Sequence, residues 1–342
     1  MTNKIGFACK WIDTPSQVNG IKSTDACKKY NVGTTTVAWL NRQTREVAEQ
    51  KLWDLMIDNI NSVYNLVEKV GTLDEQLRMV RIGSDVLPVY THTLFSEFYR
   101  RSDVRDYAEK HFVQIGDIAR GRNVRLSFHP GQFCVLASDR PEVVERSIEE
   151  FEYHADMARW MGYGKQFQDM KINVHIAGRL GPAGFLKAYD RLSPEARNCI
   201  TIENEEITHG LNDCLTICDR VPVVLDIHHH FIKSGEYIKP DDSRVNQVIN
   251  SWRGVRPTLH YSVSREDILP NHDIHTAPVL DVLLEAGYKK GKLRAHSDFY
   301  WNTAVNAWAL TFWDNFDIMC ESKGKNLASF ELYKQAKTDL VS

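Results

Sequence analysis

The densest group of reactive side chains in the sequence is at residues 221–230, VPVVLDIHHH, where branched apolar residues end in an aspartate and three consecutive histidines. The apolar run is typical of a buried strand. Carboxylate and imidazole groups are costly to bury unless a partner binds or neutralises them. A strand that ends in four such groups therefore indicates a site for a cation.

Six successive apolar segments of the chain each end in a residue that can bind a metal. In every segment this residue lies on the strand face opposite the apolar side chains that would pack against the helices. Side chains alternate between the two faces of a strand, and in a barrel one of these faces points to the axis. A single histidine at a strand end is ordinarily a hydrogen-bonded core residue. Six such groups buried together without cations would cost several kcal/mol for each unpaired charge, so the pattern indicates a shared metal site. The six residues are His129, His175, Glu203, Asp226, His260 and Glu321.

The ligand types limit which metal ions and which reactions the site suits. Imidazole and carboxylate without thiolate suit Mn²⁺, Zn²⁺, Fe²⁺ or Co²⁺ better than copper or an iron–sulfur cluster. One ion usually takes three or four protein ligands, so six ligands imply at least two ions. Paired ions favour in-line displacement at phosphorus, which indicates hydrolysis of a phosphate ester. A sugar isomerase or epimerase also uses two ions in a similar barrel, and the ligand types do not separate the two classes.

The elements that must position these residues alternate along the chain. Amphipathic helical segments, such as 141–160 with Pro141 in its first turn, separate eight apolar segments. This alternation predicts an α/β fold, a single (β/α)₈ TIM barrel over residues 1–342, with the metal cluster at the C-terminal face of the strands. No GxGxxG motif follows the first strand, which argues against a Rossmann sheet. The predicted strands are 4–9, 79–83, 124–128, 171–176, 199–203, 222–227, 257–262 and 316–321.

Two long connections, 10–35 and 263–300, are expected to surround the active site, and the second is predicted to carry a helix at 277–288. Cys214 and Cys218 are one helical turn apart. We interpret them as buried core residues on one helix face rather than as metal ligands.

Composition limits the class of protein. With 42 basic and 45 acidic residues the formal charge is −3, so only a local basic surface or bound cations would attract phosphate. The sequence has neither a membrane-spanning apolar run nor a signal peptide, and its seven cysteines show no CxxC pair. These features predict a cytoplasmic protein with reduced thiols.

The sequence contains seven short motifs rich in polar residues: FHPGQF at 128–133, NVHIAG at 173–178, IENEE at 202–206, DIHHH at 226–230, LHYS at 259–262, RAHSDF at 294–299 and CESKGK at 320–325. Their order resembles that found in UV damage endonucleases. VRIGSDVLP at 80–88, followed by His92, also resembles that family, and the resemblance extends from about residue 4 to residue 326. The resemblance implies a TIM barrel related to endonuclease IV. It further implies a DNA repair enzyme that cuts the backbone immediately 5′ of cyclobutane pyrimidine dimers, 6-4 photoproducts and some abasic sites with two or three metal ions, typically manganese.

The same resemblance implies roles for individual residues. One ion would be held by His129, His175 and Glu203. Glu203 would bridge to a second ion, which would also be held by Asp226, His260 and Glu321. A third ion would use His229 and His296, and the residues implied in catalysis are Glu203, His229, His296 and Lys323.

Some of the remaining histidines leave alternatives open. His272 and His275 compete with His296 for the third ion, and the RAHSDF match favours His296. His228 and His230 either support the metal ligands or merely belong to the loop.

DNA contacts are implied in the same way. Gln132 and Phe133 would fill the gap left when damaged bases leave the stack, although Phe133 could instead pack under its own loop. Arg81, His92 and Lys325 would contact DNA, and the alternative for Lys325 is a solvated surface lysine. The implied partner is UV-damaged double-stranded DNA bound by a monomer.

The sequence departs from the family at several positions. Thr258 stands where relatives commonly have a lysine near the metals. Phe7 and Trp11 stand where relatives tend to have a tyrosine and an asparagine that probe the lesion, and we expect these two aromatic rings to stack against it. A DNA-damage binding protein that does not cut is therefore a further alternative.

Overall fold

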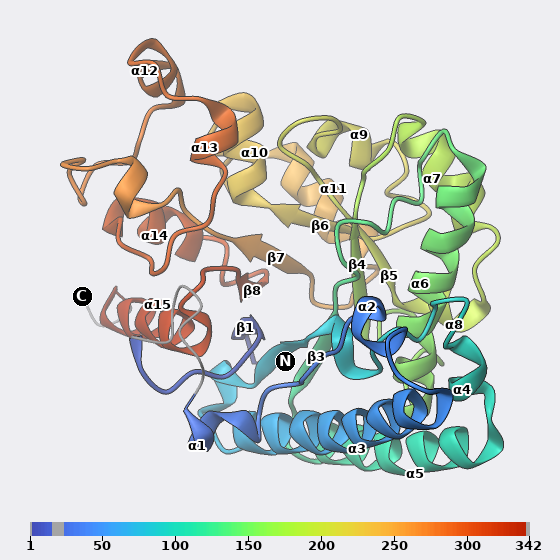
Figure 1. The fold of residues 1–342 in the computed structure, drawn as a ribbon. Helices are drawn as coiled ribbons and strands as arrows, with labels where there is room; N and C mark the ends of the chain where they lie inside the picture. The colour runs from blue at the N-terminus through green and yellow to red at the C-terminus, as the bar shows by residue number, and fades with distance from the viewer. Residues whose placement is uncertain (1, 16–23, 340–342) are drawn as a thin grey trace.

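The strands form a closed barrel in a computed structural model that describes residues 2–15 and 24–339 (Figure 1). All neighbouring strands are parallel, and β8 pairs with β1 to close the barrel. Each strand lies inside one of the predicted segments, so the predicted TIM barrel is confirmed. The strands are β1 (Ile5–Cys9), β2 (Met79–Ile82), β3 (Arg125–Phe128), β4 (Lys171–His175), β5 (Ile200–Glu203), β6 (Val223–Asp226), β7 (Thr258–Tyr261) and β8 (Asp317–Cys320).

Helices lie between the strands and cover the outside of the barrel (Figure 1). The predicted helix at 141–160 coincides with α6. None of the helices in the described part of the chain combines the length and the apolar character needed to cross a membrane. The α-helices are α1 (Asp25–Lys28), α2 (Val37–Leu40), α3 (Arg45–Val70), α4 (Ser96–Arg100), α5 (Ser102–Gly121), α6 (Pro141–Trp160), α7 (Gly181–Tyr189), α8 (Pro194–Cys199), α9 (Leu211–Leu215), α10 (Ile227–Ser234), α11 (Ser243–Ser251), α12 (Leu280–Glu285), α13 (Lys290–Leu293), α14 (Thr303–Leu310) and α15 (Lys325–Asp339).

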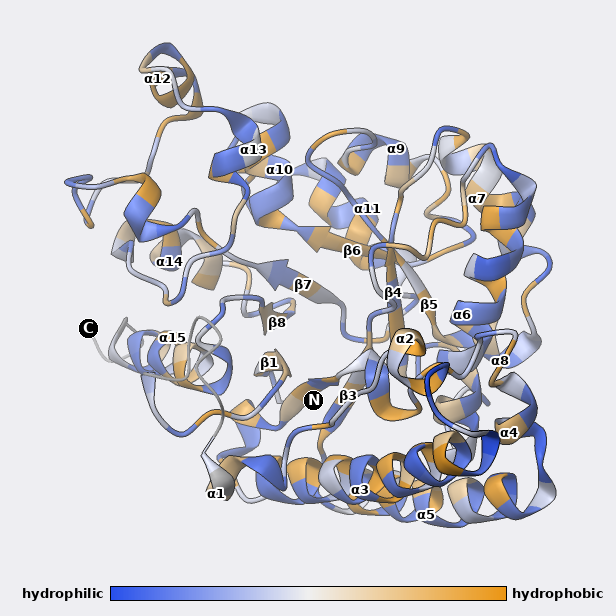
Figure 2. Cartoon of the chain, viewed as in Figure 1, coloured by the Kyte–Doolittle hydropathy of each residue, from blue (hydrophilic) through white to orange (hydrophobic). Residues whose placement is uncertain are grey.

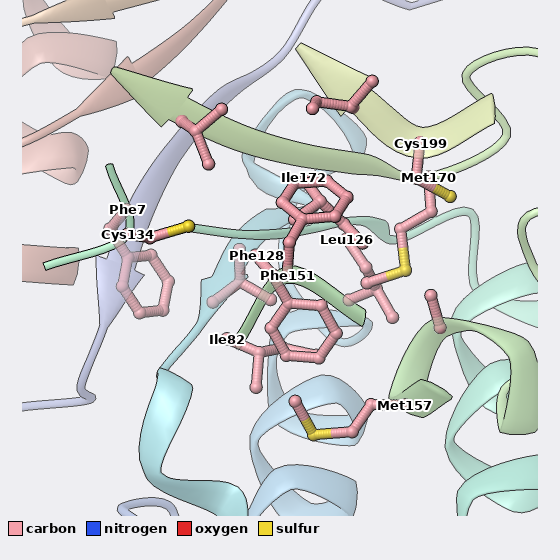
Figure 3. Packing of buried hydrophobic residues seen from close by; sticks show 14 of the residues in the cluster. Phe7, Ile82, Leu126, Phe128, Cys134, Phe151, Met157, Met170, Ile172 and Cys199 are labelled. Atoms are coloured by element: carbon pink, nitrogen blue, oxygen red, sulfur yellow. The ribbon is translucent and has the colours of Figure 1, made fainter. Parts of the chain in front are cut away.

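The main apolar core lies between the barrel and the helices. Figure 2 shows apolar and polar residues alternating along α3 and α5, as expected for helices with one buried face. Figure 3 shows Phe151 of α6 among side chains of the strands, including Phe128 and Ile172, and all three are fully buried. This layer holds the strands in place, because each helix buries its apolar side against the outer face of the barrel.

The inside of the barrel is polar at its amino-terminal end. Arg125 and Arg256 both pair with Asp317, with N to O distances of 2.6 and 2.8 Å. The backbone N–H of Lys4 also donates to Asp317 at 2.8 Å. These bonds satisfy a buried carboxylate and close the barrel below the strand ends where the chemistry is expected.

The long connection at 263–300 is only partly helical. Helix α12 is shorter than the predicted 277–288, and a second short helix, α13, follows it. Pro278 precedes α12, and Gly287 has a φ of +92°, a left-handed conformation that ends the helix. Of the other long connection, residues 16–23 lie outside the described part of the chain.

All seven cysteines are free thiols. Cys214 is buried on α9, but this helix ends at Leu215 and Cys218 is only half-buried in the turn that follows. The prediction of two buried cysteines on one helix face is therefore wrong for Cys218. The assignment of residues 1–342 to a single domain stays a prediction.

The core predicts a large effect for one aromatic residue. We expect Phe151→Ala to lower the free energy of unfolding by about 3–5 kcal/mol, because it empties a fully buried site, and urea unfolding measures this loss. Phe133→Ala is the matched control, because Phe133 is 84% exposed. The control should change stability by no more than about 0.5 kcal/mol, and equal losses in the two variants would contradict this account of the core.

Candidate metal centre

Six side chains converge at the carboxyl ends of β3 to β8, and we call them the rim cluster: His129, His175, Glu203, Asp226, His260 and Glu321. Strand register sets their level, since His175 pairs with Glu203 and Asp226 pairs with His260 in neighbouring strands. His129 and Glu321 each directly follow the last residue of a strand. The parallel topology therefore brings together the six residues that the sequence pattern singled out.

The rim cluster divides into two groups that share Glu203. The ligand atoms of His129, His175 and Glu203 all lie within 4.8 Å of one another, and so do those of Glu203, Asp226, His260 and Glu321. Glu203 lies between the groups, with Oε2 3.2 Å from Nε2 of His129 and Oε1 3.1 Å from Nδ1 of His260. A carboxylate in this position would be within reach of a cation held by either group.

Four buried ligand atoms of the rim cluster make no hydrogen bond within the described residues. They are Nδ1 of His175, Oε1 of Glu203, Oδ2 of Asp226 and Nδ1 of His260. Buried polar atoms are nearly always paired, so four unpaired atoms in one place need another partner. Divalent cations fit this set, since all four are imidazole nitrogens or carboxylate oxygens.

Hydrogen bonds behind the histidines leave the opposite ring nitrogen free to bind a metal. Nδ1 of His129 donates to the carbonyl of Pro130 at 2.8 Å, which directs Nε2 toward Glu203. The side-chain amide of Asn173 also donates to Glu203. Such contacts fix the orientation of ligands before an ion arrives.

The carboxylates of the rim cluster have opposite electrostatic tendencies. Burial by itself would raise the pKa of Glu203, but His260 and His175 hold it well below its ordinary value. Burial raises the pKa of Asp226 well above its ordinary value, and Glu203 and Glu321 add to this effect. Like charges that converge in this way favour a proton on one carboxyl until a cation replaces it.

His229 and His296 lie beside the rim cluster. His229 is in the first turn of α10, where its backbone N–H donates to Asp226 at 2.6 Å, and its Nδ1 is 3.6 Å from Glu203. Burial would lower the pKa of His229, but Asp226 and Glu203 raise it to about 9. Nδ1 of His296 donates to the carbonyl of Glu321 at 2.9 Å, and its ring centroid is 6.4 Å from that of His229.

The competing histidines make other contacts. His272 and His275 bond to the Thr276 carbonyl and the Thr303 hydroxyl within the outer loop. His230 bonds to Glu236 at 3.0 Å. His228 is buried with its ring 6.1 Å from that of His296, and its Nε2 makes no hydrogen bond within the described residues.

Sequence reasoning assigned no role to Lys171, although this lysine is four residues before His175 in the same strand and therefore shares its face. Lys171 is 3% exposed, and its Nζ lies 2.8 Å from Nε2 of His260. Burial lowers the pKa of Lys171 to about 7, against the opposing effect of Glu203. Thr258, the departure from the family pattern, is buried two residues before His260 on β7. A lysine from β4 therefore contacts the histidine that follows this threonine.

Two further residues also went unassigned in the sequence analysis. Asn204 bonds to both the backbone N–H and the carbonyl of Asp226 at 2.9 Å. Glu206 pairs with Arg294 at 2.7 Å and lies 3.7 Å from His229. Both belong to the IENEE motif, whose polar residues beyond Glu203 were the available signal.

Gln132 and Phe133, which were predicted to fill the gap left by unstacked bases, lie on the surface after β3. Phe133 is 84% exposed, so the alternative that it packs under its own loop is wrong. Gln132 is exposed as well. Both line a hollow of about 790 Å³ to which His92 and Arg140 also contribute.

The expectation that Phe7 and Trp11 stack against the lesion is wrong. Phe7 is 1% exposed and Trp11 is 8% exposed, with ring centroids 5.9 Å apart. Alternation along β1 directs Ala8 toward Met79 and Met319, so Phe7 faces the helix layer instead. Trp11 packs against Phe330 of α15.

The predicted phosphate contacts have different environments. Arg81 is mostly buried and pairs with Glu321, so its guanidinium is committed to a residue of the rim cluster. Burial alone would lower the pKa of Arg81, but Glu321 raises it. Lys325 is half-buried, so the solvated-surface alternative is wrong, and burial lowers its pKa. Lys323 lies 3.6 Å from Asp298.

The raised pKa of His229 predicts a pH dependence in protein stripped of metal by EDTA. A folded-state pKa of about 9 against an ordinary 6.5 stabilises the fold fully below pH 6.5, and this stability is lost as the pH rises through 9. The contribution is about 3 kcal/mol. The lowered pKa of Lys171 changes stability with pH in the opposite direction over this range. Lys171 is present in every variant, so its effect cancels when variants are compared with the wild type.

We therefore expect the wild type to lose more stability than His229→Gln when the pH rises from 6.5 to 9, because the variant has no His229 to lose its proton. Urea unfolding at both pH values measures the contribution as a difference from the wild type. His228→Gln is the control, because burial lowers the pKa of His228 well below its ordinary value and it does not titrate in this window. The same pH dependence in His229→Gln and the wild type would contradict the assignment.

Comparisons with known proteins agree with this geometry. The family model described as UV-endonuclease UvdE matches residues 6–341. A UV DNA damage endonuclease of Bacillus mycoides is 24% identical over 310 residues, which cover 87% of this chain and 86% of that protein. A UV-damage endonuclease of Schizosaccharomyces pombe is 25% identical over 97% of this chain, and the chain spans 50% of its length. One from Neurospora crassa is 27% identical over 64% of this chain, a stretch that spans 35% of its length.

Two solved structures share the fold. The crystal structure of SacUVDE has a TM-score of 0.70 and 23% identity and covers 98% of both chains. Endonuclease IV from Thermus thermophilus has a TM-score of 0.53 and 14% identity, covering 81% of this chain and 94% of that one. The family model covers nearly the whole chain and includes every residue of the rim cluster. The chain is a member of the UV-endonuclease UvdE family.

Proposed function

We propose that the chain is a metal-dependent DNA repair endonuclease that hydrolyses the phosphodiester immediately 5′ of UV photolesions. Its substrates would be cyclobutane dimers, 6-4 photoproducts and abasic sites in double-stranded DNA. The observation that carries the proposal is the position of Glu203, which two groups of ligand-type residues share at the mouth of the barrel. Membership of the UvdE family supplies the substrate class.

The chain's residues divide the work as follows. His129, His175 and Glu203 would hold one ion, and Glu203, Asp226, His260 and Glu321 a second. His229 and His296 would complete a third site. When bound, such ions act as Lewis acids toward the scissile phosphate and lower the pKa of water. Mn²⁺ is the proposed metal, with Zn²⁺, Mg²⁺ and Co²⁺ as the alternatives.

Neighbouring residues prepare the site for an anionic substrate. Arg81 balances part of the negative charge of Glu321, and Lys325 adds a second cation close by. Lys323 is more exposed and can approach a phosphate oxygen from the start of the loop after β8. Positive charge at fixed positions stabilises charge that develops on phosphate oxygens during the reaction.

Recognition of damage is assigned to Gln132 and Phe133. A planar amide and an exposed aromatic ring, three and four residues after His129, can enter the gap that unstacked bases leave. A lesion is cheaper to unstack than an intact pair, so selectivity would follow partly from the deformability of the DNA. The protein would act as a monomer, since one open rim is enough for this contact.

A nicking assay tests the proposal. With Mn²⁺, the protein should cut a duplex carrying one thymine dimer immediately 5′ of the dimer, and an undamaged duplex should stay intact. Glu203→Gln should reduce cutting by at least about a thousandfold, because it removes the charge shared by both ligand groups. Binding without cutting by the wild type would favour a DNA-damage binding protein, and neither activity would favour a sugar isomerase.

The proposed role of Phe133 in damage recognition makes a separate prediction. Phe133→Ala should lower the rate of cutting at a dimer by roughly ten- to hundredfold through loss of stacking, with little loss of stability. Phe133→Tyr should retain most of the activity, and Leu94→Ala, at another exposed apolar residue, should have no effect. Full activity of Phe133→Ala would remove this residue from damage recognition.

A further inference from the structure

A compact run of basic residues stands out in a chain whose net charge is −3. Residues 288–294, YKKGKLR, which we call the basic arm, contain three lysines and one arginine and no acidic residue. The basic arm includes α13 and belongs to the long connection between β7 and β8. Figure 1 shows α12 standing out from the body of the barrel and α13 lying beside α10.

The connection that carries the basic arm is fastened at the mouth of the barrel. Its two ends meet in an antiparallel bridge between Ser264 and His296. The backbone N–H of Ser297 donates to the carbonyl of Val263 at 2.9 Å, and the hydroxyl of Ser264 donates to the carbonyl of Leu293 at 2.6 Å. The end of the basic arm is therefore fastened two residues before His296, whose Nδ1 donates to the carbonyl of Glu321.

Packing against α10 fixes the other side of the basic arm. Leu293 is buried in a small apolar cluster with Phe231 and Ile232. Nζ of Lys290 donates to the carbonyl of Lys233 at 2.8 Å. Since α10 begins with the histidine run that follows β6, the basic arm lies on the α10 side of the proposed metal site.

The four cations of the basic arm differ in what they contact. Arg294 pairs with Glu206, which in turn approaches His229, so its charge is already balanced. Lys289 and Lys292 are exposed, and neither forms an ion pair with any residue in 2–15 or 24–339. Two positive charges without an ion-pair partner among these residues thus lie on the connection that follows β7, on a segment that internal bonds hold in place.

We propose that Lys289 and Lys292 bind backbone phosphates of the DNA duplex on one side of the cleavage site. The proposal rests on the proposed function and deepens it, because it names the surface that holds the DNA next to the cleavage site. Lysines that contact phosphates carry no sequence information, so the basic arm holds damaged and intact duplexes alike. Its role is to supply the local attraction that the acidic net charge does not give.

The experiment measures binding of an undamaged duplex and of a duplex with one thymine dimer as salt is varied between about 50 and 200 mM. Dimer binding is measured in the Glu203→Gln background, so that the DNA stays whole. The variant Lys289→Ala/Lys292→Ala should bind both duplexes more weakly by roughly tenfold or more. It should also flatten the slope of log affinity against log salt by about 1.8, about 0.9 for each lost contact.

Matched controls separate the basic arm from charge in general. Lys165→Ala/Lys334→Ala removes two exposed lysines from other parts of the molecule. Lys165 precedes β4 at the opposite end of the barrel, and Lys334 follows Tyr333, which contacts Gln76 just before β2. This control should leave the salt slope unchanged. Trimming the duplex on one side of the lesion should abolish the effect of the Lys289/Lys292 substitutions, and trimming the other side should not.

The possible results distinguish this inference from the proposed function. If the wild type cuts at the dimer but the arm variant keeps its affinity and salt slope, the arm is not a DNA contact and the endonuclease proposal stands. If the effect of the Lys289/Lys292 substitutions survives trimming on the one side and also survives trimming on the other, the inference is overturned as well. If the wild type neither binds nor cuts DNA, both proposals fail.

Discussion

A fully buried carboxylate surrounded by other ionisable groups is the constraint on which this site depends. Glu203 is in contact with His129 and His260 and belongs to both groups of ligand-type residues. Neighbouring imidazoles keep it ionised, while burial, together with the charges of Glu203 and Glu321, raises the pKa of Asp226. Such an arrangement is costly for a protein alone, and the proposed divalent ions would remove that cost.

The barrel makes this concentration of charge sterically possible. Parallel strands end at the same rim, so residues far apart in sequence reach one place without long flexible side chains. Below the rim, the Arg125–Asp317–Arg256 bonds close the axis, and around the strands the apolar layer supports them. The rim cluster is thereby supported from below and from the sides, and the proposed duplex substrate would approach it from the rim.

An acidic protein must hold DNA through local features. The residues proposed to hold the ions and the cations near Glu321 lie in the strands or just after them, and the exposed Phe133 and the basic arm lie on the connections that follow β3 and β7. Positive charge at the rim would attract the DNA backbone whether or not the bases are damaged. Phe133 would instead respond to how easily the bases unstack. Attraction and discrimination would then come from different side chains on the same face.

The sequence by itself determined the eight strands and the six residues of the rim cluster, because hydrophobic runs and alternate positions are local properties of the chain. Family motifs added His229 and His296, which the period of a strand cannot place. Only the tertiary structure decided that Phe7 and Trp11 face the helix layer, and that Lys171 reaches His260 across the barrel. It also decided that Arg81 pairs with Glu321. Contacts of this kind depend on which elements become neighbours when the barrel closes, and no local pattern in the chain records that.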